Sequence, residues 1–327
     1  MSEALAAVLR RRLLIVSGKG GSGKSSICAA LALLAARAGR RVAAVELADE
    51  TLLPRLLVAA PPAGAGEPRS EPQPLEGSLH HLRLAPGFAL AEYLESQLRS
   101  ARIARAIVGN AGIQRLLDAA PGWRDLITLG KLWHLTTRES QGQPRWPLLI
   151  VDAPATGHGL SLLSGPAAVT ELVRSGPLRR HVDAVLALLR DPERTLVLPV
   201  ALAEELPINE VLELREGVRA LGVALGPVIV NALEPALPRA AALLAGVARL
   251  PAEPPSPLLD PRALRALLEE RAARCALQQR QLARLRSATA QSALELPYLP
   301  DGICGPADSR SLAAELERSA ARLERAA

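Results

Sequence analysis

Short, almost wholly apolar runs alternate along the chain with longer stretches of helical periodicity. The runs cover residues 13–16, 42–45, 148–151, 195–203 and 223–230. Such runs are typical of strands buried on both faces, and helical stretches between them indicate parallel connections. The pattern therefore predicts an α/β fold with a mostly parallel sheet that helices cover on both faces. Pro199 lies inside one run and is expected to mark a bulge or an edge, because proline lacks the N–H that pairs strands.

The stretches between the strands predict one deeply packed helix and two segments outside the sheet. Residues 25–38 are apolar nearly all round and stop at Gly39, so this helix should lie against the sheet. Residues 59–77 are rich in Pro, Gly and Glu and are expected to form a surface loop. Residues 88–138 are helical in pattern and are expected to form an inserted helical subdomain. We expect the whole chain, residues 1–327, to be a single domain.

Two segments towards the C-terminus each admit two interpretations. Residues 258–291 are predicted to be helical, and their part 262–286 holds seven Arg against two Glu. This excess of positive charge suits a solvated helix face or a docking face for an acidic partner. Residues 311–327 suit a helix that packs against the sheet or a membrane-facing helix, and their few bulky apolar residues favour packing.

Composition narrows the classes of function. Of 327 residues, 49% are apolar and 22% charged, as in globular proteins, and the net charge is +6. The aromatic residues are three Trp, two Tyr and one Phe, too few to stack the bases of a single-stranded nucleic acid. Three cysteines without a CxxC pair indicate a reducing compartment. With no apolar stretch near the roughly 20 residues of a membrane span and no signal peptide, we expect a soluble cytoplasmic protein.

A glycine-rich loop follows the first apolar run and leads directly into the first long helix. Residues 17–26 read SGKGGSGKSS, which satisfies the pattern G-x-x-x-x-G-K-[ST] of a phosphate-binding loop. Glycines let backbone N–H groups turn towards phosphate oxygens, and the helix N-terminus adds positive potential. Lys24 should reach the β- and γ-phosphates of ATP, and the Ser25 hydroxyl should bind Mg²⁺. The residues expected to bind the nucleotide here are Gly18, Gly20, Gly21, Ser22, Gly23, Lys24, Ser25 and Ser26.

A carboxylate is expected near this loop. Asp152 follows the apolar run at 148–151, at the carboxyl edge of the sheet, where open α/β sheets bind ligands. A carboxylate in this position commonly holds Mg²⁺, often through water. Asp152 and Ser25 are therefore the predicted metal residues.

Two motifs carry a resemblance to a known family. The loop has a second lysine, Lys19, as in the deviant Walker A sequence GKGGxGK[ST], and residues 152–160 read DAPATGHGL. This combination resembles the ArsA family, which includes arsenite-pump ATPases and targeting ATPases for tail-anchored membrane proteins. Further segments agree with bacterial ArsA-like ATPases; they are residues 90–94, 120–133, 204–210, 228–231 and 296–300.

The resemblance implies a nucleotide held in a dimer. Lys19 would reach across the interface to the nucleotide of the other subunit, and Asn231 and Pro297 would flank adenine. Gly157 and His158 would belong to a switch that moves when the γ-phosphate leaves.

The sequence also departs from the family. The strand after the first helix usually ends in an Asp that orients the attacking water, and our preferred alignment puts Ala48 there. Asp49 could serve if the loop shifts by one residue, and Glu46 is another candidate. Without a positioned acceptor, hydrolysis should be slow, because a general base typically contributes 10²–10⁴-fold. The scattered cysteines offer no arsenite cluster and no zinc clamp.

Three functional hypotheses follow. The first is an ArsA-like ATPase that acts as a homodimer and uses nucleotide-dependent switching to handle a protein cargo or a membrane partner. The second is a positioning or regulatory ATPase like ParA and MinD. The third is a catalytically degenerate subunit that binds nucleotide and forms a heterodimer with an active paralogue.

Overall fold

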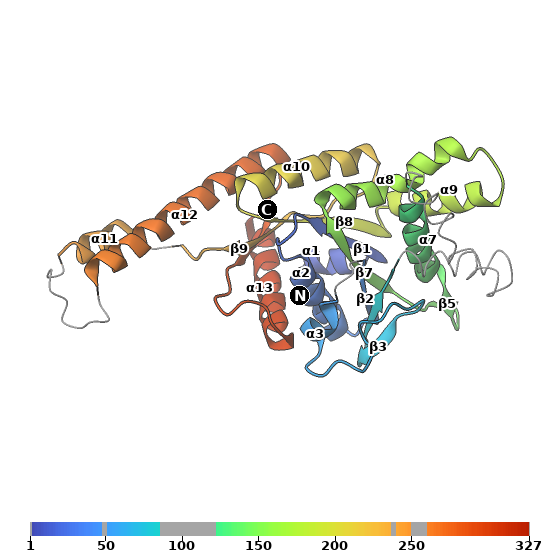
Figure 1. The fold of residues 1–327 in the computed structure, drawn as a ribbon, viewed down its shortest axis with the longest axis horizontal. Helices are drawn as coiled ribbons and strands as arrows, with labels where there is room; N and C mark the ends of the chain where they lie inside the picture. Colours follow the sequence, from blue (N-terminus) through green and yellow to red (C-terminus); the bar gives the residue numbers. More distant parts are fainter. Residues whose placement is uncertain (1, 48–50, 86–121, 237–239, 250–259, 327) are drawn as a thin grey trace, which may run out of the picture.

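The computed structural model describes residues 2–47, 51–85, 122–236, 240–249 and 260–326. Its main feature is an eight-stranded sheet with the order β10-β9-β8-β1-β7-β2-β4-β3, drawn in Figure 1. All neighbouring pairs are parallel except the antiparallel pair of β3 and β4. The strands are β1 (Leu13–Gly18), β2 (Val42–Glu46), β3 (Gln73–Glu76), β4 (Leu79–Arg83), β7 (Leu148–Ala155), β8 (Thr195–Leu202), β9 (Ile229–Leu233) and β10 (Leu294–Pro297). A separate hairpin joins β5 (Glu139–Ser140) to β6 (Gln143–Pro144). The predicted α/β class with a mostly parallel sheet is confirmed.

Helices cover both faces of this sheet (Figure 1). One face carries α1 (Glu3–Leu9), α2 (Lys24–Arg37), α3 (Leu53–Leu57) and α13 (Pro306–Ala326). The other carries α7 (Trp123–Thr137), α8 (Thr156–Leu172), α9 (Pro177–Arg190) and α10 (Glu205–Ala220). The strands between them are buried on both sides, as their apolar runs predict.

Two details of the strands differ from the sequence pattern. Within the run at residues 223–230, the strand begins only at Ile229. Before it, Leu225 forms an isolated bridge with Val197. Pro199 lies in β8 between two neighbouring strands and its pairing with β1 is regular, so it marks neither an edge nor a bulge on that side. The N–H of Val197 donates to the carbonyl oxygen of Ala224, on the side of β9. Pro199 lies two residues further along the strand and therefore faces the same side. The N–H that Pro199 lacks would thus point towards β9, whose regular pairing with β8 begins only at Val200.

The C-terminal helix packs into the core. Leu312, Leu316 and Ala320 of α13 are fully or almost fully buried and join the cluster formed by α1, α2 and the sheet. Packing is thus the interpretation of residues 311–327 that the structure supports. Among the helices in the described ranges, none has the length and apolar character to cross a membrane.

The predicted surface loop is fastened to the body of the molecule. The last part of residues 59–77 forms the edge strand β3. Before it, Glu71 contacts three cationic side chains from residues 131–145. Arg138 donates to Glu71, while the nitrogens of Lys131 in α7 and of Arg145 both lie 3.9 Å from its carboxylate. Residues 123–137 of the expected helical subdomain form α7, and most of the rest lies outside the described residues.

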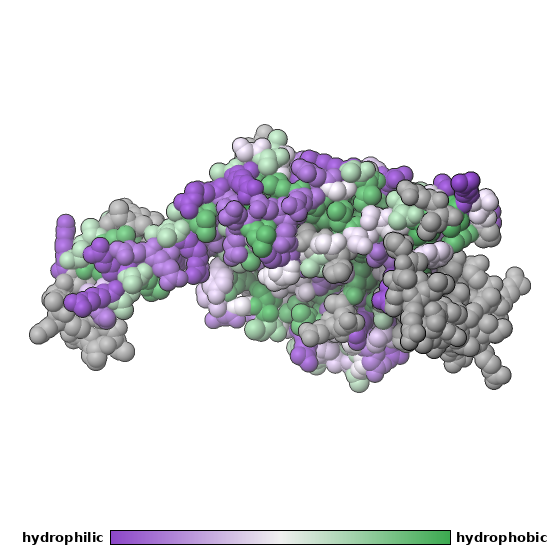
Figure 2. Space-filling view, turned by 45° about the horizontal axis from the view of Figure 1, so that its top comes forward, coloured by the Kyte–Doolittle hydropathy of each residue, from purple (hydrophilic) through white to green (hydrophobic). Residues whose placement is uncertain are grey.

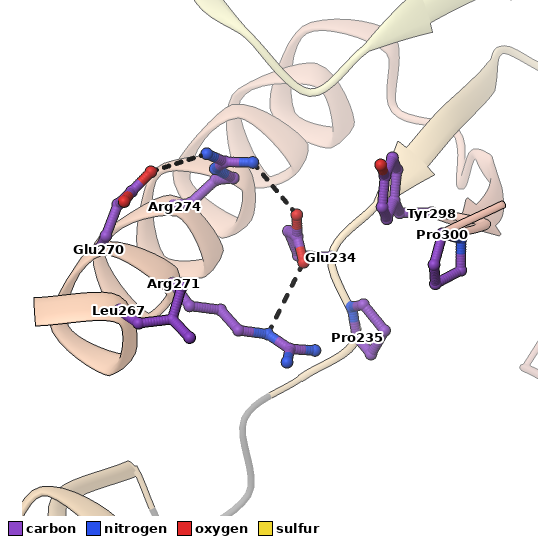
Figure 3. Close-up of a pocket in the computed structure, with 8 residues that line it drawn as sticks. All are labelled: Glu234, Pro235, Leu267, Glu270, Arg271, Arg274, Tyr298 and Pro300. Carbon is purple, nitrogen blue, oxygen red and sulfur yellow. Dashed lines mark hydrogen bonds and ion pairs between the residues drawn. The ribbon is translucent and has the colours of Figure 1, made fainter. Parts of the chain in front are cut away.

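The arginine-rich segment forms part of α12 (Pro261–Thr289), which extends from the body together with α11 (Ala240–Val247) (Figure 1). Hydrophilic side chains cover most of its visible face in Figure 2. Four of its arginines form ion pairs within the chain; they are Arg265, Arg271, Arg274 and Arg286. Figure 3 shows Glu234, at the end of β9, between Arg271 and Arg274. Four glutamates thus offset part of the positive charge of this segment; they are Glu234, Glu269, Glu270 and Glu295.

The packing of α13 predicts the effect of one truncation. Leu316→Ala removes a side chain that is 0% exposed and should lower the free energy of unfolding by about 2–5 kcal/mol. Leu267→Ala is the matched control, because Leu267 on α12 is 61% exposed and its loss should change stability by less than about 0.5 kcal/mol. Urea unfolding followed by circular dichroism measures both. Equal effects of the two substitutions would contradict the packing of α13.

Candidate nucleotide site

The glycine-rich loop turns from β1 into α2 through residues that require glycine. Gly21 and Gly23 have φ of +79° and +90°, in the left-handed region that side chains disfavour. Gly23 is the N-cap of α2 and supplies no side-chain hydrogen bond. The first N–H groups of α2 are thus left for a ligand, and the helix dipole makes this end attractive to phosphate.

Neighbouring strands hold the loop at very short range. A Cβ atom on Gly18 would lie 2.0 Å from the carbonyl oxygen of Val200, and one on Gly23 would lie 2.2 Å from Nδ2 of Asn231. Asn231 donates from Nδ2 to the carbonyl oxygen of Ser22 at 3.0 Å. The predicted adenine residue Asn231 therefore touches the phosphate loop itself.

The backbone after Asn231 is unusual. Ala232 has φ of +55°, and Gln278 from α12 fixes this point through Ala232 and Glu234. A left-handed conformation at a residue other than glycine costs free energy and persists only where its surroundings hold it. Here this conformation occurs at the residue directly after Asn231, whose side chain contacts the phosphate-binding loop.

The predicted metal residues meet. Ser25 donates from Oγ to Oδ2 of Asp152 at 2.5 Å, and Asp152 is opposite Val16 of β1 and Glu46 of β2 in the sheet register. Burial raises the pKa of Asp152 to about 6, although the Ser25 hydroxyl and the Lys24 ammonium favour its carboxylate form. A hydroxyl beside a carboxylate is a donor set that suits Mg²⁺, which takes oxygen ligands.

The lysine and serine of the loop fit a phosphate group. Lys24 donates from Nζ to the carbonyl oxygen of Lys19 at 3.1 Å, and burial lowers its pKa against the opposing effect of Asp152. The hydroxyl of Ser22 is buried without a hydrogen-bond partner among the described residues. Such an atom is normally satisfied, so it is a ready donor for a ligand oxygen. Ser26 follows Ser25 in the first turn of α2.

Lys19 points to a different partner. Its Nζ lies 3.3 Å from Oε1 of Glu210 on α10, with both side chains partly exposed. The two residues line a hollow of about 520 Å³, whose wall includes Gly157 at the start of α8. The side chain of His158 lies outside the described residues.

Pro297 ends β10 beside a second hollow. It is opposite Leu233 in the sheet register, and Tyr298 donates its backbone N–H to Leu233 at 2.7 Å. Tyr298 and Pro300 face Glu234 and Pro235 across a space of about 250 Å³ (Figure 3). Asn231 and Pro297 are thus on adjacent strands, as two residues that flank one base would be.

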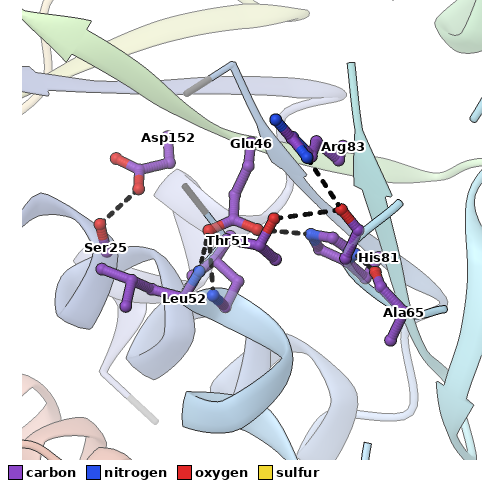
Figure 4. A network of polar contacts seen from close by, with 10 residues as sticks. Ser25, Glu46, Thr51, Leu52, Ala65, His81, Arg83 and Asp152 are labelled. Carbon is purple, nitrogen blue, oxygen red and sulfur yellow. Dashed lines mark hydrogen bonds and ion pairs between the residues drawn. The ribbon is translucent and has the colours of Figure 1, made fainter. Parts of the chain in front are cut away.

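The water-orienting residue is the part of the site that is not seen. Ala48 and Asp49 lie outside the described residues. Glu46 is described, and both of its carboxylate oxygens are taken: Oε1 accepts the N–H groups of Leu52 and Leu53, and Oε2 lies 2.6 Å from Nε2 of His81 (Figure 4). Three hydrogen bonds and nearly complete burial thus hold the Glu46 carboxylate away from solvent.

His81 is the residue at this edge that sequence reasoning missed. The pair His80 and His81 lacks metal-ligand spacing, and nothing else in the sequence singles it out. The available signal was the alternation of β4, in which Leu79, His81 and Arg83 share one face of the strand. Only the register with β2 brings His81 to Glu46.

A family model agrees with this geometry. Residues 13–119 match the CobQ/CobB/MinD/ParA nucleotide binding domain. The matched residues make up about a third of the chain and are similar to that nucleotide-binding domain. The matched region includes β1, the glycine-rich loop, α2 and β2, whereas Asp152 and Asn231 lie beyond it.

Curated proteins extend the similarity beyond the P-loop domain. The chain is 33% identical over 226 residues to ATPase BagA of Mycobacterium tuberculosis and to a putative ATPase of Mycobacterium bovis. It is 28% identical over 217 residues to an arsenical pump-driving ATPase of Escherichia coli. These matches cover 69%, 69% and 64% of this chain, and 66%, 66% and 33% of the relatives' lengths. The predicted resemblance to ArsA-like ATPases is confirmed at low identity.

The ion pair of Lys19 predicts the effect of removing one charge. Glu210→Gln frees the ammonium beside the P-loop and should lower the Kd of Mg·ATP about two- to fivefold, the range set by exposed ion pairs of up to about 1 kcal/mol. Glu213→Gln is the control, since Glu213 lines the same hollow and its loss changes the net charge equally. Fluorescence titration at low salt measures both. An equal gain in the two variants would show that only the overall charge matters.

Proposed function

We propose that the protein is a dimeric ATPase that binds Mg·ATP at residues 17–26 and uses the nucleotide to switch its handling of a protein or other cargo. The observation that carries this proposal is the uncapped N-terminus of α2 with Ser25 and Asp152 in contact beside it. Proteins named as ATPases among its relatives support the same reading.

Each residue of the site receives a role in this proposal. Lys24 neutralises the β- and γ-phosphates, and the N–H groups of residues 20–26 cradle their oxygens. Ser25 and Asp152 hold Mg²⁺, which supplies charge stabilisation when bound. Asn231 and Pro297 lie beside the base.

Lys19 gives the argument for a dimer. A lysine that served its own phosphates would turn into the loop, as Lys24 does, whereas Lys19 turns to Glu210 at the edge of an open hollow. From there its ammonium is available to a nucleotide on a second subunit. Release from Glu210 would then accompany assembly, which couples nucleotide state to subunit packing.

Hydrolysis is proposed to be slow. Glu46 is committed to hydrogen bonds, and the preferred alignment places Ala48 where an acceptor for the attacking water is expected. Loss of a positioned acceptor typically costs 10²–10⁴-fold in rate. Turnover should thus fall well below the roughly 10 s⁻¹ of a median enzyme.

One alternative is favoured by the same observation. A subunit with an intact P-loop but no water-orienting group could bind nucleotide without hydrolysing it and act in a heterodimer with an active paralogue. Addition of a paralogue would then raise turnover, whereas the homodimer alone would show none.

A ParA- or MinD-like positioning role draws support from the family model, and liposome flotation with ATP tests its membrane form.

Two lysine variants test the proposal. Lys24→Ala should abolish Mg·ATP binding, because it removes the ammonium from the phosphates. Lys19→Ala should keep binding within a few-fold but lose ATP-dependent dimerisation and turnover. Equilibrium titration, sedimentation velocity with a non-hydrolysable analogue and phosphate release are the measurements. Wild-type turnover that equals the Lys24→Ala background would exclude an active homodimer, and dimers of Lys19→Ala would exclude the role of Lys19.

A further inference from the structure

Glu46 and His81 form a buried polar pair next to the metal residues. Their side chains are 2% and 1% exposed, and they join β2 to β4 at the carboxyl edge of the sheet. Glu46 is opposite Asp152 in the register of β2 and β7. The pair therefore lies one strand away from the carboxylate that is proposed to hold Mg²⁺.

The hydrogen bonds of the pair require an additional proton. Nδ1 of His81 lies 2.7 Å from the carbonyl oxygen of Ala65, and Nε2 lies 2.6 Å from Oε2 of Glu46. Both neighbours are acceptors, whereas a neutral imidazole has one N–H. Oε1 of Glu46 already accepts two backbone N–H groups. We place the additional proton on Nε2 of His81, which then donates from both nitrogens.

This pair holds two separate segments in place (Figure 4). Oε1 of Glu46 accepts the N–H groups of Leu52 and Leu53 at 2.7 and 3.0 Å and so fixes the start of α3. Ala65, bound by His81, belongs to the surface segment that packs on Thr51, whose hydroxyl donates to Gly66 at 3.3 Å. The start of α3 and residues 65–66 are thus tied to the end of β2.

We propose that Glu46 and His81 are positioning residues for the nucleotide reaction, which hold the carboxyl end of β2 and the start of α3 in register with the Ser25–Asp152 pair. The inference rests on the proposed ATPase function. The hydrogen bonds with His81, Leu52 and Leu53 also hold the Glu46 carboxylate in place. Asp152 is then left as the carboxylate that serves Mg²⁺.

Two substitutions of Glu46 separate geometry from charge. Glu46→Gln keeps a carbonyl oxygen for Leu52 and Leu53 and can donate its amide N–H to a neutral His81, so the contacts survive without the charge. Glu46→Asp keeps the charge but is one methylene shorter, so it cannot reach both α3 and His81. Because a misplacement of about 1 Å can cost up to 10²-fold, we expect Glu46→Asp to lower kcat about tenfold or more and to leave the Kd of Mg·ATP unchanged. Glu46→Gln, which keeps these contacts, should have a kcat within about threefold of the wild type.

Controls separate positioning from mere stability. His80→Asn alters the other face of β4, where His80 lies against Trp146, and should leave kcat unchanged. All variants are compared below their unfolding transitions, with urea unfolding measured alongside. If Glu46→Asp lowers only stability and keeps the kcat of the folded protein, the positioning role is wrong. A Glu46→Gln variant as slow as Glu46→Asp would equally overturn it.

A spectroscopic readout tests the pair without ATP turnover. In the nucleotide-free wild type at neutral pH, ¹⁵N–¹H spectra should show hydrogens on both ring nitrogens of His81, and Glu46→Gln should reduce them to one. A single ring N–H in the wild type would overturn the placement of the proton on His81. If the wild type shows this signature but no ATP turnover, the proposed ATPase function fails while the pair stands.

Discussion

The site depends on a close approach between backbones. The loop after β1 passes so near to Val200 and Asn231 that Gly18 and Gly23 leave no room for a Cβ atom. This contact lets β8 and β9 set the position of the loop, which in turn sets the start of α2. Rigid strands therefore aim the helix N-terminus, and the hydrogen bond from Lys24 to the carbonyl oxygen of Lys19 adds a contact within the loop. Asp152 and Glu46 reach the same edge because the central strands are parallel and end together.

Features that are local in the sequence could be predicted from it. The glycine loop, the helix that follows and the apolar central strands each occupy one short stretch, and the structure has them within a few residues of the expected bounds. The contact of Ser25 with Asp152 also follows from topology, since both lie where parallel strands end. Edge strands were harder, because β3 is largely exposed and its sequence reads as a loop.

Features that depend on strand register could not be predicted. Glu46 and His81 are distant in the chain, and each is ordinary alone: an acid after an apolar run, and one of two histidines. Their pairing requires that β4 be placed beside β2 and aligned to the residue. The same holds for Lys19 and Glu210, since α10 meets the loop only after the sheet is assembled. Charges illustrate the point further, because Glu234, which is distant from α12 in the sequence, pairs with Arg271 and Arg274.

The fastening of the surface segment limits how this protein can vary. Composition indicates only that residues 59–77 form a surface loop. Yet Ala65 is bound to His81, and Glu71 pairs with Lys131 of α7 and with Arg138 directly after it, so the chain between these two points spans a fixed distance. Sequences of relatives should therefore keep the length of this stretch wherever they keep the histidine, and should change both together. A segment that reads as a plain surface loop is thus part of the sheet edge.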